Sequence, residues 1–93
     1  MSGLSPIERK KLKARAHALN PLVHLGDKGL TDAVIAEIGR ALDAHELIKV
    51  RAGAMDRHER EAALAAICAR LSAQPVQHIG KIFVLFRPKP KEA

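Results

Sequence analysis

The sequence of 93 residues suffices for one folded domain and leaves no room for a second hydrophobic core. Its 16 Lys and Arg residues outnumber 10 Asp and Glu residues, and a net charge of +6 attracts nucleic acid or an anionic membrane. The single cysteine excludes a disulfide within the chain, no secretory signal follows Met1, and the longest apolar run, Ile82 to Phe86, is too short to span a membrane. We therefore expect a cytoplasmic protein without a membrane partner.

The first predicted helix begins after Ser5, which is followed by Pro6 and, at the position that completes a capping box, by Glu8. We expect this helix to run to about Ala18 and to stop before Pro21. Helical spacing places Leu12, Ala16 and Leu19 on an apolar stripe, and Arg9, Lys10, Lys13 and His17 on a basic stripe beside it.

A short strand is expected over Leu22 to Leu25, and it ends at Gly26-Asp27-Lys28-Gly29. Thr31 is the expected N-cap of the second helix, with Asp32 in its first turn, where an acid complements the helix dipole. The buried side of this helix is expected to carry Val34, Ile35, Ile38 and Leu42.

A second strand is expected over Leu47 to Ala52, where apolar residues alternate with Lys49 and Arg51. One face of this strand should therefore be core and the other basic. The sequence leaves open whether Lys49 and Arg51 are accessible or whether the first helix covers that face. A third helix begins at Asp56, with Glu59 as its capping partner, and its apolar stripe contains Leu64, Ile67, Cys68 and Leu71.

The last two strands are expected over Val76 to Ile79 and Ile82 to Arg87, joined by a Gly80-Lys81 hairpin turn. The order α-β-α-β-α-β-β predicts an α/β (α+β) fold, with a four-stranded mixed sheet in which the hairpin reverses one strand. We expect residues 1–87 to form a single domain and the Pro- and Lys-rich residues 88–93 to form a flexible tail.

The Gly26 to Gly29 segment is the sharpest local motif in the chain. Two glycines between a strand and a helix allow a tight turn and a close approach of a ligand to backbone N–H groups. The helix N-terminus adds a positive dipole end and Lys28 adds a mobile charge, the arrangement with which a GXXG loop grips nucleic-acid backbone. The alternative is an ordinary strand-to-helix turn, because short glycine motifs are weak signals on their own.

The basic stripe of the first helix is the second candidate site, because its cations can neutralise phosphates and the helix holds a single acid, Glu8. Lys49 and Arg51 would extend this patch. The loop and the helix cations must then belong to one surface without acids between them. Because the only aromatics are Phe83 and Phe86, both in the last strand, binding should rest on phosphates, 2′-hydroxyls and shape rather than on base stacking.

Catalysis has little support in the sequence, since none of the five histidines sits in an HExxH pattern and Cys68 has no cysteine partner for a zinc site. Cys68 lies on an apolar stripe and is expected to be a buried structural thiol. We therefore expect a protein that is not an enzyme, with no cofactor, metal or small-molecule substrate.

Several motifs together resemble the CRM domain, and more closely its stand-alone bacterial YhbY-type form, from about Ser5 to Arg87. They are Leu12-Lys13, Ala16-His17, Leu19, Pro21, the run Leu25 to Thr31, the run His45 to Val50, and the turn Gly80-Lys81. The resemblance implies a fold similar to the C-terminal domain of translation initiation factor three with an added N-terminal helix. It also implies an RNA-binding protein whose bacterial relatives associate with precursors of the large ribosomal subunit. The family's GxxG loop maps to Gly26, Asp27, Lys28 and Gly29, where Asp27 replaces the frequent Asn or Ser.

The sequence therefore predicts an RNA-binding protein that assists ribosome assembly, with ribosomal RNA or pre-ribosomal particles as partner. The predicted RNA-binding residues are Gly26, Asp27, Lys28, Gly29, Arg9, Lys10, Lys13, His17, Lys49 and Arg51. The alternative is a protein-docking module whose basic first helix recognises an acidic partner. Duplex DNA binding is a further alternative, which the lack of a helix-turn-helix spacing weakens.

Overall fold

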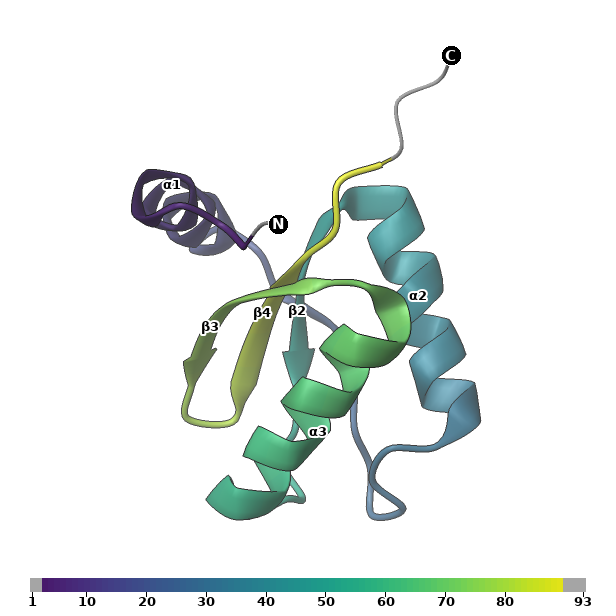
Figure 1. Cartoon of the computed structure of the whole chain (residues 1–93). Helices are drawn as coiled ribbons and strands as arrows, with labels where there is room; N and C mark the ends of the chain where they lie inside the picture. The colour runs from purple at the N-terminus through teal and green to yellow at the C-terminus, as the bar shows by residue number, and fades with distance from the viewer. Residues whose placement is uncertain (1–2, 90–93) are drawn as a thin grey trace.

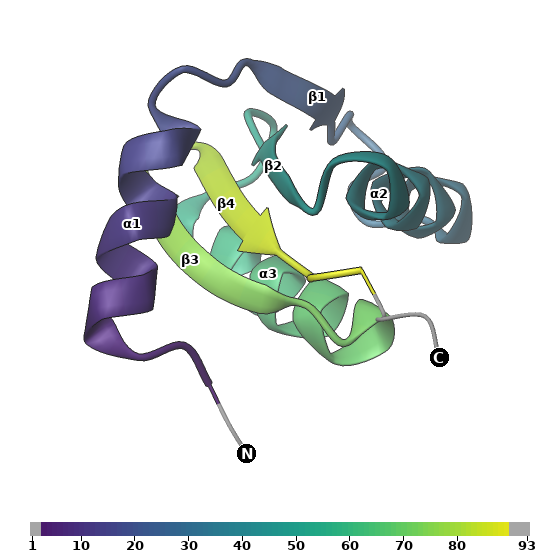
Figure 2. The ribbon, with the colours of Figure 1, turned by 90° about the horizontal axis from the view of Figure 1, so that it is seen from above.

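The computed structural model describes residues 3–89 and contains three helices and four strands. In chain order these are α1 (Pro6–Ala16), β1 (Pro21–His24), α2 (Asp32–His45), β2 (Leu47–Arg51), α3 (Arg57–Leu71), β3 (Gln74–Ile79) and β4 (Ile82–Phe86). The sheet order is β1-β2-β4-β3, with β1 parallel to β2 and β4 antiparallel to both of its neighbours. Figures 1 and 2 show the sheet between α1 on one side and α2 with α3 on the other. The predicted α-β-α-β-α-β-β order and four-stranded mixed sheet are confirmed.

Each helix begins at the cap residue expected from the sequence. Ser5 and Glu8 exchange side-chain-to-backbone hydrogen bonds of 2.9 and 3.1 Å at the start of α1. Asp56 and Glu59 form the same capping box on α3, and Thr31 accepts a bond from the backbone of α2. Caps of this kind satisfy otherwise unpaired N–H groups and stabilise a helix by about 1 kcal/mol each.

The ends of several elements differ from the sequence prediction by one or two residues. Helix α1 ends at Ala16 rather than near Ala18, because the next N–H, of His17, bonds to the carbonyl of Ala14 and tightens the last turn. Strand β3 begins early because Pro75 sits on an edge strand, next to an irregularity in register, where its missing N–H is tolerated. The other strands are shifted or shortened by one residue, and they span Pro21–His24, Leu47–Arg51 and Ile82–Phe86.

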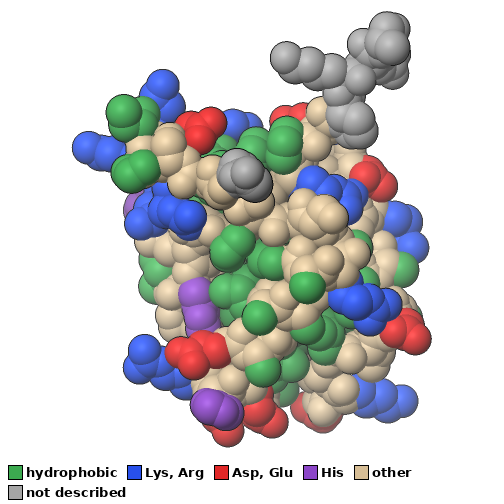
Figure 3. Space-filling model, in the orientation of Figure 1, with side chains coloured by type: hydrophobic (Ala, Val, Ile, Leu, Met, Phe, Trp, Pro, Cys, Tyr) green, Lys and Arg blue, Asp and Glu red, His purple; other side chains and the backbone are tan. Residues whose placement is uncertain are grey.

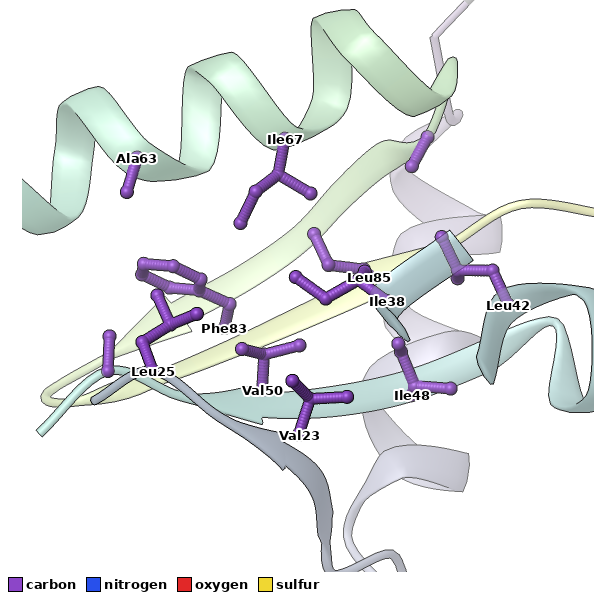
Figure 4. Close-up of a cluster of buried hydrophobic side chains, with 12 residues drawn as sticks. Val23, Leu25, Ile38, Leu42, Ile48, Val50, Ala63, Ile67, Phe83 and Leu85 are labelled. Carbon is purple, nitrogen blue, oxygen red and sulfur yellow. The ribbon is translucent and has the colours of Figure 1, made fainter. Parts of the chain in front are cut away.

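The main hydrophobic core lies between the sheet and helices α2 and α3 (Figure 4). Its fully buried side chains include Phe83 of β4, Ile38 of α2 and Ile67 of α3. Gly39 of α2 faces α3, and an added Cβ there would lie 3.4 Å from the Leu71 side chain, an ordinary van der Waals distance. The glycine weakens α2 as an isolated helix, and the packing against α3 leaves room for an alanine.

A second, smaller core forms on the opposite face of the sheet, where α1 packs. Leu12 and Ala16 of α1 are buried against Leu47, Val84 and Val76. The outward face of β2 is therefore apolar at its start and basic only further along, which corrects the expectation of a wholly basic face. Helix α1 crosses the upper half of this sheet face in Figure 1 and leaves the lower half uncovered.

The segment that follows β4 is held to α2 and α3 by Arg87. Its guanidinium donates to the backbone carbonyls of Leu71 and Gly39 at 2.9 and 3.2 Å and contacts the carboxylate of Asp43 at 2.5 Å. Residues 88–93 were expected to form a flexible tail. Within this segment the backbone N–H of Lys89 donates to the Glu46 carboxylate at 2.8 Å. Residues 90–93 lie outside the described part of the chain.

Candidate nucleic-acid interface

The glycine loop between β1 and α2 is a tight turn closed by its own backbone. The N–H of Gly29 donates to the carbonyl of Gly26 at 2.9 Å. Gly29 has a φ of +70°, a conformation that costs glycine little, and an added Cβ there would meet Met55 at 3.3 Å. Asp27 and Lys28 at the tip are exposed. The turn therefore presents a lysine and backbone groups immediately before the N-terminus of α2, where anions are favoured.

The loop and α1 lie at opposite ends of the molecule rather than side by side. Helix α1 is at the upper left of Figure 1, whereas the loop that leads into α2 is at the bottom. Figure 2, the view from above, also shows the two segments apart. Lys28 and the cations of α1 therefore cannot act as one cluster. They can share a ligand only if basic residues of the sheet connect them.

The uncovered half of the sheet supplies this connection. Lys49 and Arg51 are two residues apart on β2, so both point to the α1 side of the sheet, with Lys49 half-buried near α1 and Arg51 exposed. Arg51 is in register with His24 of β1, which is also exposed. The backbone carbonyl of Arg51 accepts a hydrogen bond of 2.8 Å from the N–H of Leu25, the residue before Gly26. A row of basic residues therefore runs from α1 across the sheet to the loop.

This half of the sheet, which we call the open sheet face, is defined by one row of side chains that crosses all four strands. Cross-strand register places His24, Arg51, Ile82 and Ile79 in that row. None of the four strands contains an Asp or Glu. Figure 3, which looks along the sheet with α1 at the upper left, shows Asp and Glu side chains beside the Lys and Arg residues. The strands of the open sheet face therefore contribute basic residues and no acidic ones, whereas α2 and α3 carry both.

The predicted residues of α1 have different roles in the structure. The Arg9 guanidinium donates to the carbonyls of Pro75 and Val76, the latter at 3.1 Å, and thereby fastens α1 to the edge strand β3. Lys13 and His17 lie on the side of α1 that borders the open sheet face, and Lys10 is exposed on the helix surface. Arg9 is therefore partly a structural residue, whereas Lys13 and His17 lie at the candidate interface.

Comparison with known proteins identifies the family. Residues 4–87 match the model of the CRS1 / YhbY (CRM) domain. The chain belongs to the CRM domain family. It is 48% identical over 88 residues to a protein of Haemophilus influenzae named RNA-binding protein, covering 95% of this chain and 89% of the relative. It is 40% identical over 88 residues to the probable RNA-binding protein PA4753 of Pseudomonas aeruginosa, covering 95% of this chain and 85% of that protein.

The fold of this CRM domain is also found in a solved structure. The solution structure of SAV1595 from Staphylococcus aureus superposes with a TM-score of 0.82, covers 97% of this chain and 94% of the other, and has 23% sequence identity. At this identity the likeness concerns the fold, and it agrees with the predicted α/β arrangement. The relatives from Haemophilus influenzae and Pseudomonas aeruginosa are both named for RNA binding.

Three residues of the candidate interface were not predicted from the sequence. His24 faces the open sheet face from β1, Gln77 lies beside α1 on β3, and Lys81 is exposed in the hairpin. The alternation of His24 with the buried Val23 and Leu25 is a signal that could have placed it outward. Gln77 had no such signal, because the register of β3 shifts between Pro75 and Gln77.

Cys68 is the single thiol of the chain. Cys68 is half-buried, and burial raises the pKa of its thiol, which disfavours the reactive thiolate. Among residues 3–89, no group of three His, Cys, Asp or Glu side chains is placed to hold a metal ion. No helix of the described chain is long and apolar enough to cross a membrane.

Proposed function

We propose that this protein binds structured RNA through the open sheet face together with the Gly26 to Gly29 loop. The observation that carries the proposal is the row of cations that joins α1 to the loop across strands without acidic residues. Cations that neutralise several phosphates supply most of the affinity for nucleic acid, and acids nearby would oppose them. The names of the relatives from Haemophilus influenzae and Pseudomonas aeruginosa support the same partner.

We further propose that the RNA is ribosomal, and that the protein acts on precursors of the large subunit in the cytoplasm. The resemblance of the chain to bacterial YhbY-type proteins supports this choice. Residues 1–87 would act as a single RNA-binding domain. The lack of exposed Phe, Tyr or Trp side chains on the open sheet face favours a contact with folded RNA rather than with bases stacked along a single strand.

Charge reversal at two positions of the row tests the binding surface. Lys28→Glu in the loop and Arg51→Glu on the open sheet face should each weaken binding to a large-subunit ribosomal RNA transcript about tenfold in a filter assay, because each turns a phosphate contact into a repulsion. Both side chains are exposed, so thermal unfolding should change little. Arg40→Glu is the matched control, since Arg40 is exposed on α2, on the opposite side of the sheet.

The control separates local contacts from net charge. If Arg40→Glu weakens binding as much as Arg51→Glu does, the positive charge acts without a defined surface and the assigned site is wrong. If the wild-type protein does not bind the transcript at moderate salt, the function itself is wrong. Competition with duplex DNA of equal length tests the DNA alternative.

A protein-docking function is the second candidate, and the structure offers one feature in its favour. Leu22 of β1 is 48% exposed beside a groove lined by Arg15, Leu19, His45 and Leu47. Sedimentation of a cell lysate on a gradient distinguishes the two functions. The RNA proposal expects the protein in particles that contain large-subunit precursors, and nuclease treatment should release it. A protein-docking module would stay in its complex after the nuclease.

A further inference from the structure

A groove lies between the C-terminal half of α1 and the sheet, and we call it the α1 groove. It is lined by Lys13, His17, Lys49, Gln77, Ile79 and Ile82. Its volume of about 180 Å³ is smaller than the ~300–1,000 Å³ of pockets that enclose drug-sized ligands. The groove therefore fits one small flat group rather than an extended segment.

The floor of the α1 groove is apolar and open to solvent. Ile79 and Ile82 are directly opposite each other across β3 and β4, next to the Gly80-Lys81 turn. The Ile79 side chain is 57% exposed, which leaves apolar surface in water on the same face as the cations. A ligand with a flat apolar face would remove this surface from water, at a gain of roughly 25 cal/mol per Å².

The rim of the α1 groove is polar and has unused bonding capacity. Lys13 and Lys49 flank it, both half-buried, and neither forms an ion pair with any residue from 3 to 89. Gln77 is in register with Val84 and half-buried, and its amide has no hydrogen-bond partner in the described chain. The groove therefore offers two cations, an amide that both donates and accepts, and an apolar floor.

We infer that the α1 groove holds one unpaired nucleotide of the bound RNA, an inference that rests on the proposed function. Lys13 and Lys49 would contact its phosphate, Ile79 and Ile82 the face of its base, and Gln77 a base edge. An RNA nucleotide combines an anion, a flat ring and a hydrogen-bonding edge, which are the three kinds of group that the lining of this groove can contact. The groove would thus contact a base, whereas the Gly26 to Gly29 loop would contact only the sugar–phosphate backbone of the RNA.

Two RNA probes with the same stem test this inference, one a hairpin with an unpaired loop and the other a blunt duplex. The double variant Gln77→Ala, Ile79→Ala should lower affinity for the hairpin about fivefold and lower affinity for the duplex much less, because the duplex has no unpaired base for the groove. The matched control is Ile7→Ala, because Ile7 is 69% exposed on α1 outside the groove. Lys28→Glu should lower the affinity for both probes, since Lys28 would contact the sugar–phosphate backbone that both RNAs contain.

A second measurement uses the wild-type protein, so that the test does not depend on a variant. In a heteronuclear correlation spectrum, the side-chain amide signals of Gln77 should shift when the hairpin is added and stay in place with the duplex. Equal effects of the double variant on both probes, or an unmoved Gln77 amide with bound hairpin, would overturn the inference while the RNA-binding function stands. Displacement of the hairpin from the groove by a polyglutamate peptide, with the same Gln77 shift, would assign the groove to an acidic protein instead. Failure to bind either probe would contradict the proposed function itself.

Discussion

The two faces of the sheet differ in how completely helices cover them, although the same four strands supply both. The face toward α2 and α3 is closed over fully buried side chains such as Phe83, Ile38 and Ile67. The face toward α1 is closed only where Leu12 and Ala16 pack, and beyond them it is open and basic. Stability is therefore concentrated on one side of the sheet and ligand contacts on the other, so that each can change with little effect on the other.

Removal of Phe83 should be the largest single loss of stability. Phe83→Ala empties a fully buried site at the centre of the α2–α3 face and should lower the free energy of unfolding by about 3–5 kcal/mol. Urea denaturation followed by circular dichroism measures this loss. RNA affinity of the folded fraction should stay near that of the wild type. A loss below about 1 kcal/mol would mean that this face is not the main source of stability.

A change on the α1 face should be smaller and more local. Leu12→Ala should lower the free energy of unfolding by about 2 kcal/mol, near the lower end for such substitutions, because Leu12 belongs to the smaller core cluster. Amide hydrogen exchange should accelerate mainly in α1. Ile7→Ala, on the exposed side of the same helix, should cause no measurable change. Faster exchange throughout α2 and α3 in Leu12→Ala would show that the two faces are not independent.

The smallest expected effect concerns pH at the start of α1. Bonds from the backbone N–H and the hydroxyl of Ser5, with Lys11 nearby, hold the pKa of Glu8 below its ordinary value. Because the folded-state pKa is lowered, the cap is complete above the ordinary pKa and is lost as pH falls through the lowered pKa. The amide proton shift of Ser5 should follow this titration in an acid pH series, and Glu8→Gln should abolish it. A Ser5 shift that still titrates in that variant would assign the effect to another group.

Local features of this fold could be predicted because they depend on neighbouring residues. The caps at Ser5, Thr31 and Asp56 lie where the sequence placed them, since each bond joins residues three positions apart. The Gly80-Lys81 turn was equally local, and Gly80 adopts a φ of +54°. The order of the strands in the sheet was harder to predict from the sequence, because the pairing of β2 with β4 depends on packing between segments that are distant in the chain.

The candidate site could be predicted only in parts. The sequence identified Lys49 and Arg51, but the coverage of their face by α1 depended on tertiary packing of Leu12 against Leu47. The bonds of Arg9 to β3 were also hidden, because no sequence pattern relates a helix cation to carbonyls 66 and 67 positions later. Separation along the chain gave no measure of how far the loop lies from α1.

The position of Arg9 has a consequence for self-association. Strand β3 is an edge of the sheet, and an unpaired edge is a template on which another chain can add a strand and begin to aggregate. The Arg9 guanidinium occupies the carbonyls of Pro75 and Val76, and Pro75 offers no N–H to an incoming strand. A second molecule would have to displace a charged side chain to extend the sheet there. One arginine of a helix predicted to bind RNA thus also blocks strand addition at the start of the β3 edge.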